Sequence, residues 1–161
     1  MTPVLKNISE KKFIGQRISM SIANNKTREL WRNFMPRRNE INYKVSTDFF
    51  SLQKYPSNFN FTNFNVNAEF EKWALIEVDN FDEVPQGVET FILEGGIYAA
   101  FIYKGNANNA AEFFKNIFTK WIPELGYEID SRPHFEILGD KYKRDSDDSE
   151  EEIWIPIKLK A

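Results

Sequence analysis

Hydrophobic and polar positions change their spacing several times along the chain, and each change predicts an element. The first half gives the order strand, helix, strand, strand, predicted at 11–22, 27–34, 43–52 and 72–78. Asn24 and Asn25 precede the helical spacing and suit a helix start. Pro36 ends it, because proline cannot continue a helix. Between the last two strands, the Asn/Phe-rich residues 54–67 are predicted to form an irregular excursion.

The second half repeats this order, with elements predicted at 97–103, 110–121, 135–138 and 153–157. In its helix the apolar residues recur with the period of an α-helix: Ala110, Phe113, Phe114, Ile117, Phe118 and Trp121. Pro123 and Gly126 are expected to end that helix. Aligning Pro36 with Pro123 places Trp31 on Phe118, so we interpret the two halves as structural repeats.

Two units of strand-helix-strand-strand predict an α+β fold, with an antiparallel sheet, the helices on one face and the other face open to a ligand or partner. We expect a single domain over residues 1–161, with repeat one at about 12–80 and repeat two at about 90–160. The residues 81–88 would connect the repeats. Because everything after Phe13 belongs to the repeats, no DNA-binding domain is expected.

The last predicted strand separates two kinds of side chain. Its three isoleucines within 153–157 alternate onto one face, which should be the buried one, and Glu152, Trp154 and Pro156 share the other. Pro156 has no amide hydrogen, which predicts an edge strand or a bulge there. We expect Glu136 to lie beside Glu152 and Trp154 in an anionic aromatic pocket, which would favour cations. The alternative is that both acids are ordinary solvent-exposed strand residues.

Composition removes several kinds of chemistry. The 161 residues include no cysteine and one histidine. Thiolate catalysis, disulfides and Cys-ligated zinc are therefore excluded, a Ser-His-Asp triad is disfavoured, and we interpret His134 as structural or surface-exposed. We find no metal or cofactor motif and expect no cofactor.

The charge balance and the apolar runs bear on partners and location. The 21 basic and 24 acidic residues give a net charge of −3, which disfavours general nucleic-acid binding. There is no long apolar run and no signal-peptide pattern, so we expect a cytoplasmic protein without membrane contact.

Four features of the second half occur in a distinctive order. They are an aromatic strand ending in Lys104-Gly105, a helix ending in WIPELGY, the strand PHFE, and the closing EEIWIPIKL. In combination they resemble the GyrI-like small-molecule-binding domain, as does the segment from Ile14 to Pro36. This domain is the effector-binding module of many AraC-type and MerR-type regulators, and it also occurs alone in bacterial DNA gyrase inhibitor proteins.

The resemblance implies two repeats related by a pseudo-twofold axis, with a ligand cleft between them. The residues it implies for ligand binding are two acids and five aromatic positions: Glu152, Glu136, Trp121, Tyr98, Tyr103, Trp154 and Phe101. Glu152 would be the buried acid that engages cationic ligands. The register of Glu150, Glu151 and Glu152 leaves open which of the three faces the cleft.

Three functions remain open at this point. The leading hypothesis is a stand-alone module that binds a lipophilic or cationic small molecule, in multidrug binding, drug or toxin sequestration, or transcription regulation. The first alternative is a hydrolase of the same superfamily, with Glu152 as general base and Tyr98 or Tyr103 as hydrogen-bond donor.

The second alternative is an inhibitor that binds a protein partner through the acidic run 145–152, whose simpler interpretation is a solvated loop. The residues 141–144 would then pair with that loop. A homodimer through an exposed edge strand is a further option, and no direct contact with nucleic acid is expected.

Overall fold

The computed structural model describes residues 1–63, 65–143 and 145–160, and within them nine strands join in one antiparallel sheet. The strands are β1 (Val4–Ile8), β2 (Lys11–Met20), β3 (Phe49–Lys54), β4 (Phe70–Val78), β5 (Glu89–Leu93), β6 (Gly96–Lys104), β7 (Tyr127–Ile129), β8 (His134–Leu138) and β9 (Glu150–Leu159). The helices are α1 (Thr27–Phe34), α2 (Ala111–Asn116) and α3 (Ile122–Glu124). Short 3₁₀ turns lie at η1 (Met35–Glu40) and η2 (Ala107–Asn109), and a π turn at η3 (Ile117–Trp121).

The strand order confirms the predicted α+β fold with two related repeats. The sheet runs β1-β6-β9-β8-β3-β4-β2-β5, with β7 paired to β9. The order stays the same when β2 is exchanged with β6, β3 with β8, and β4 with β9. In this exchange β5, which pairs with β2, corresponds to β1, which pairs with β6. The antiparallel pair of β3 and β8 lies at the centre of this pseudo-twofold arrangement.

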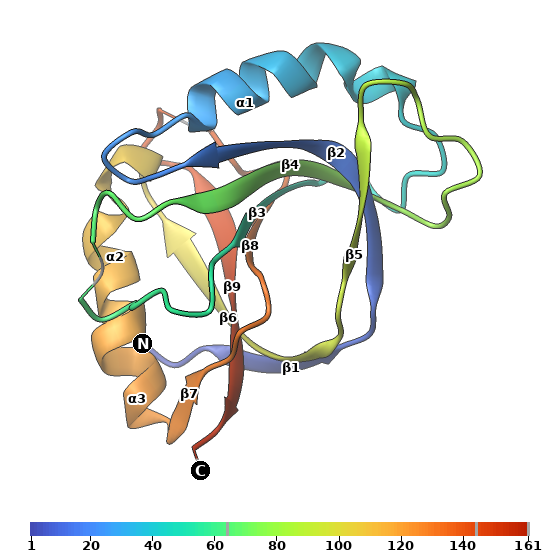
Figure 1. Ribbon diagram of the computed structural model, residues 1–161. Helices are drawn as coiled ribbons and strands as arrows, with labels where there is room; N and C mark the ends of the chain where they lie inside the picture. Colours follow the sequence, from blue (N-terminus) through green and yellow to red (C-terminus); the bar gives the residue numbers. More distant parts are fainter. Residues whose placement is uncertain (64, 144, 161) are drawn as a thin grey trace.

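Both helical segments cover the same face of the curved sheet, which we call the helix face (Figure 1). Over one half, α1 packs its buried Leu30 and Phe34 against β2 and β4. Over the other half, α2, η3 and α3 pack against β6 and β9. Residues that lie opposite one another on neighbouring strands share a face. One row of such residues on the helix face crosses β4, β3, β8, β9 and β6 in that order: Ala74, Ser51, Glu136, Ile153 and Phe101.

The opposite face, which we call the aromatic face, is filled by side chains from both repeats. Its buried members are Phe13, Phe50, Leu52, Trp73, Leu75, Leu93, Tyr98 and Phe135. The rings of Phe135 and Trp154 stack at 5.4 Å between centroids. The expectation that this face stays open to a ligand is therefore wrong, because close-packed rings occupy the space.

Some predicted boundaries also differ from the structure. β3 begins at Phe49, because Tyr43 adopts a turn conformation with φ 62° and interrupts the predicted strand 43–52. Pro123 lies inside α3, and Gly126 lies in the turn just after the helix, where its φ of 82° suits glycine. The short strands β1, β5 and β7 were not predicted. They add to the ends of longer strands and show little alternation of their own.

The prediction of an edge strand at Pro156 is wrong. β9 lies inside the sheet, with β6 along one side. On its other side β8 pairs with residues 152–154 and β7 pairs with 157–159, so Pro156 falls between two partners. Its carbonyl accepts a hydrogen bond from the amide of Asp130. The missing amide hydrogen therefore costs no ladder bond, and β9 offers no free edge to a second copy of the chain.

Candidate functional site

A cleft of about 810 Å³ lies on the helix face, between the two helical segments and over the central strands. The aromatic side chains in its wall come from α1, β3, α2 and the segment between β8 and β9: Trp31, Phe49, Phe114 and Tyr142. Polar side chains of β3, β4, β8 and β9 also line it: Ser51, Lys72, Glu136 and Glu151. The cleft exists because α1 and α2 cover the outer strands of the two repeats and leave the β3–β8 centre without a helix.

The two cleft acids have pKa values above those of ordinary carboxyl groups. Burial raises the pKa of Glu136, while the charge of Lys72 and a hydrogen bond from the Gln53 amide, 3.4 Å away, oppose the rise. Burial and then repulsion from Glu136 raise the pKa of Glu151 to about 8, against the opposing charge of Lys72. The ligand-free cleft therefore keeps a proton on the pair of Glu136 and Glu151 at neutral pH.

Glu136 and Glu152 do not share a face, so the predicted pocket of these two acids with Trp154 is wrong. In the β8–β9 register Glu136 lies opposite Ile153, and Glu152 lies opposite Ile137. Residues opposite one another share a face, so Glu136 points to the helix face and Glu152 away from it. Glu152 is exposed and accepts a hydrogen bond from Trp154 Nε1 at 3.1 Å. Of the three acids left open by the sequence, Glu151 is the one that lines the cleft.

Two of the predicted aromatic residues lie on the aromatic face. Tyr98 is fully buried, and its hydroxyl donates to the carbonyl of Pro133 at 2.8 Å. Burial raises the pKa of Tyr98 far above its ordinary value. Trp154 packs beside Tyr98 and Phe135. Neither Tyr98 nor Trp154 lines the cleft.

The other three predicted aromatic residues belong to the core beneath α2. Phe101 is buried and stacks on Trp121 at 5.8 Å. The hydroxyl of Tyr103 donates to the carbonyl of Asn106 at 2.7 Å. Of the seven predicted site residues, the structure therefore brings only Glu136 into the cleft lining.

Sequence reasoning missed most of the cleft, although some of its residues leave a signal. Lys72 is a charged residue in an otherwise apolar alternation with Ala74, Ile76 and Val78, which are all buried under α1. Glu151 lies two residues before Ile153 and so shares the face of that isoleucine. Ser51 carries no such signal, because its place depends on the pairing of β3 with β8.

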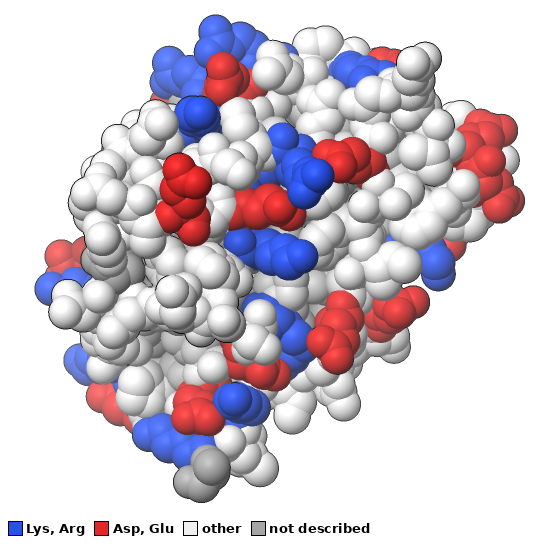
Figure 2. Space-filling view, in the orientation of Figure 1, with Lys and Arg blue, Asp and Glu red and all other residues white. Residues whose placement is uncertain are grey.

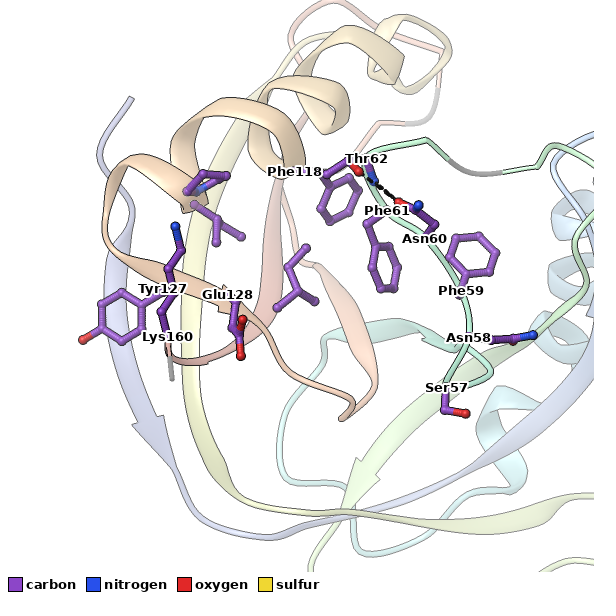
Figure 3. A pocket seen from close by; sticks show the side chains of 13 residues that line it. Ser57, Asn58, Phe59, Asn60, Phe61, Thr62, Phe118, Tyr127, Glu128 and Lys160 are labelled. Atoms are coloured by element: carbon purple, nitrogen blue, oxygen red, sulfur yellow. Dashed lines mark hydrogen bonds between the residues drawn. The ribbon is translucent and has the colours of Figure 1, made fainter.

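A second, smaller groove of about 430 Å³ lies between the excursion after β3 and the α3–β7 region. Phe61 and Phe118 meet there at 5.3 Å between ring centroids (Figure 3). The described part of the excursion is irregular, as predicted, and Phe64 lies outside the described residues. Phe61 also stacks on buried His134 at 4.7 Å. Burial lowers the pKa of His134 to about 3, so its ring is neutral and has a packing role.

On the face of the molecule that Figure 2 shows, Lys and Arg side chains are interspersed with Asp and Glu, and neither sign of charge forms a large continuous patch. The acidic run 145–152 is divided: Asp145, Asp147 and Asp148 are exposed in a turn, and the last three acids begin β9. Lys141 lies 3.8 Å from Glu150, and Arg144, from the same predicted pairing, lies outside the described residues.

The described residues contain neither a helix suited to a membrane nor a cluster suited to a metal ion. Within 1–63, 65–143 and 145–160, no helix has the length and apolar character needed to cross a membrane. The same part of the chain contains no cluster of three or more His, Cys, Asp or Glu side chains that could hold a metal ion.

Comparison with known proteins gives a family and a set of structural relatives. The family model of the GyrI-like small molecule binding domain matches residues 1–158. The transcriptional regulator BrlR of Pseudomonas aeruginosa is 29% identical over 130 residues, which are 80% of this chain and 45% of the regulator. The chain therefore spans less than half the length of this relative.

Two solved structures share the fold. SAV2435 bound to tetraphenylphosphonium aligns with a TM-score of 0.67 at 15% identity, covering 98% of this chain and 94% of that one. EcmrR in its DNA complex aligns with a TM-score of 0.70 at 14% identity, covering 99% of this chain and 58% of that one. At these identities the likeness concerns the fold.

Proposed function

The chain belongs to the GyrI-like small-molecule-binding family, and on this premise we propose that the cleft between α1 and α2 binds a lipophilic aromatic cation. The observation that carries the proposal is the presence of two carboxyl groups, Glu136 and Glu151, in a cleft walled by Trp31, Phe49 and Phe114. The fold is shared with effector-binding parts of transcription regulators, so we infer that the chain is an effector-binding module.

The chemistry of the cleft suits a cation for two reasons. Aromatic faces attract positive charge through the ring quadrupole. A carboxyl group that burial keeps protonated ionises when a cation supplies its counter-charge, so the ligand recovers binding energy that the empty cleft does not use. The tetraphenylphosphonium bound to SAV2435 is a ligand of this kind, which supports the choice of probe.

In this proposal Glu151 takes the role that the resemblance gave to Glu152. The test is calorimetric titration with tetraphenylphosphonium of the wild type, Glu151→Gln and Glu152→Gln. We expect Glu151→Gln to weaken binding by about tenfold or more, because it removes a charge next to the ligand. Glu152→Gln is the matched control, one residue away on the other face, and should change the affinity by less than about twofold.

Two results would contradict the proposal. Equal losses in both variants would mean that the cleft does not hold the ligand, and the absence of any binding to the wild type would remove the cation as a ligand. Turnover of an ester-bearing cation that disappears in Glu151→Gln would favour the hydrolase alternative instead.

A further inference from the structure

The floor of the cleft carries a positive charge together with its two acids. Lys72 of β4 is only 9% exposed and lines the cleft with Glu136 of β8 and Glu151 of β9. Although burial raises the pKa of both acids, the charge of Lys72 acts against the rise in each of them. The three groups therefore form one electrostatic cluster, in which the lysine already belongs to the acids.

The sheet register brings these groups together on the helix face. Gln53 lies opposite Lys72 in the β3–β4 register, and its amide donates to Glu136 Oε1 at 3.4 Å. Ser51 lies opposite Glu136 in the β3–β8 register. Gln53 and Ser51 are each 5% exposed, so polar groups continue from β4 to β8 with little contact with water. Charges in such a place are weakly screened by solvent, and each of them acts strongly on a ligand.

The charges of this cluster nearly cancel in the empty cleft. Lys72 contributes one positive charge, and the acid pair, which keeps one proton at neutral pH, contributes one negative charge. Of the other described residues that line the cleft, only Arg28 is charged, and it is exposed on α1. A ligand with one positive charge displaces the proton of the pair, and the two carboxylates then balance the ligand and Lys72. A second positive charge on the ligand has no such counterpart and is repelled by Lys72.

From this arrangement we propose that Lys72 restricts the cleft to ligands with a single positive charge. The inference rests on the proposed function and deepens it, because it names the charge of the ligand and the residue that sets this charge. Lys72 repels a dication more strongly than a monocation. Without Lys72 the two carboxylates can balance two positive charges on the ligand, so its loss should open the cleft to dications.

The test uses two phosphonium ions of the same shape, (4-tert-butylphenyl)triphenylphosphonium and (4-trimethylammoniophenyl)triphenylphosphonium, titrated calorimetrically at pH 8. A charged nitrogen replaces the central carbon of the tert-butyl group, so the first ion is a monocation and the second a dication. We expect the wild type to bind the monocation about tenfold or more tightly than the dication. Lys72→Met should reduce this preference by about tenfold or more, and Lys72→Arg, which keeps the charge, should retain it.

Two further variants and a second pair of ligands make the result specific. Lys54→Met removes an exposed lysine from the neighbouring strand β3 and should leave the preference unchanged. Lys72→Gln repeats the loss of charge with a polar side chain, should Lys72→Met fail to fold in a thermal melt. The smaller pair of 4-tert-butyl-N,N,N-trimethylanilinium and 1,4-bis(trimethylammonio)benzene repeats the comparison, should the phosphonium pair be too bulky for the cleft.

The outcomes separate the two proposals. If Lys72 acted only by holding the acids in their ionised form, its loss would weaken the dication at least as much as the monocation. A preference that does not fall in Lys72→Met and Lys72→Gln therefore overturns the inference. A wild type that binds the dication as tightly as the monocation also overturns it, and both results leave the cation proposal in place. A wild type that binds none of these cations, nor tetraphenylphosphonium, overturns the proposed function and the inference together.

Discussion

The two faces of the sheet where β8 meets β9 use the same strands for opposite purposes. On the aromatic face, Phe135 is 1% exposed and packs against Trp154, Tyr98 and Phe50. The next residue of β8, Glu136, lies on the helix face and lines the cleft. One face is filled by rings from both repeats, while the other is left without a helix at its centre. The cleft therefore forms over the central strands, the part of the sheet that no helix covers.

The neighbours Glu151 and Glu152 repeat this contrast at the scale of single residues. Glu151 loses solvent and has a pKa of about 8, whereas Glu152 is exposed and hydrogen-bonded to Trp154. Their chemistry is the same and their environments are not. The difference predicts that substitutions on the aromatic face change stability, and that substitutions in the cleft change binding and its response to pH.

The largest expected effect is a loss of stability on the aromatic face. Phe135→Ala should lower the free energy of unfolding by about 3–5 kcal/mol, because it leaves a cavity among the rings of Phe50, Tyr98 and Trp154. Leu138→Ala, a half-buried residue of the same strand that lines the cleft, should cost about 1 kcal/mol. Urea denaturation of both variants measures the difference. Similar losses would show that the cleft side of β8 is as tightly packed as the aromatic face.

The next effect is a pH dependence of cation binding. Because Glu151 is protonated below a pKa of about 8, a cation that binds its ionised form must displace a proton. The affinity for tetraphenylphosphonium should therefore rise by up to about tenfold per pH unit from pH 6 towards 8 and level off above it. Titrations in buffers of different ionisation enthalpy would detect the released proton. Glu151→Gln should flatten the profile, and an unchanged slope in that variant would assign the proton to another group.

The smallest effect is a gain in stability. The pKa of Glu151 rises from an ordinary 4.5 to about 8 in the folded protein, so the folded state binds more protons between these values. Its contribution to stability is complete below pH 4.5 and is lost as the pH rises through 8. Glu151→Gln removes that loss and should be about 0.5–2 kcal/mol more stable than the wild type at pH 9. Thermal melts at pH 5 and pH 9 test this, with Glu152→Gln as the unchanged control. A variant less stable than the wild type at pH 9 would mean that the ionised carboxylate is well compensated.

Much of the fold could be predicted from the sequence because local spacing reports local structure. The helical period at 110–121 and the apolar strands around 11–22 and 72–78 placed the repeated elements of both halves. The cleft could not be predicted in this way. Trp31, Ser51, Lys72 and Glu151 come from four separate elements, and no local pattern brings them together.

The strands that were missed have a physical reason in common. β1 and β5 are five-residue strands at the two ends of the sheet order, where they add to β6 and β2. Such strands need no strong alternation, because they are held mainly by backbone hydrogen bonds to a longer neighbour. The sequence pattern of a strand is clear only where one of its faces is buried.

The order of amino acids alone assigns residues to the two sides of each strand, since side chains alternate with a period of two. Glu136 therefore lies on the other side of β8 from Phe135, and Glu151 lies on the same side of β9 as Ile153. Which of these sides come together depends on how the strands pair, because a pairing offset of one residue reverses every side chain relative to the neighbouring strand. The observed register sets Glu136 beside Ile153, which joins Glu136 to Glu151 and leaves Glu152 on the other face. That single offset determines which acid the cleft contains.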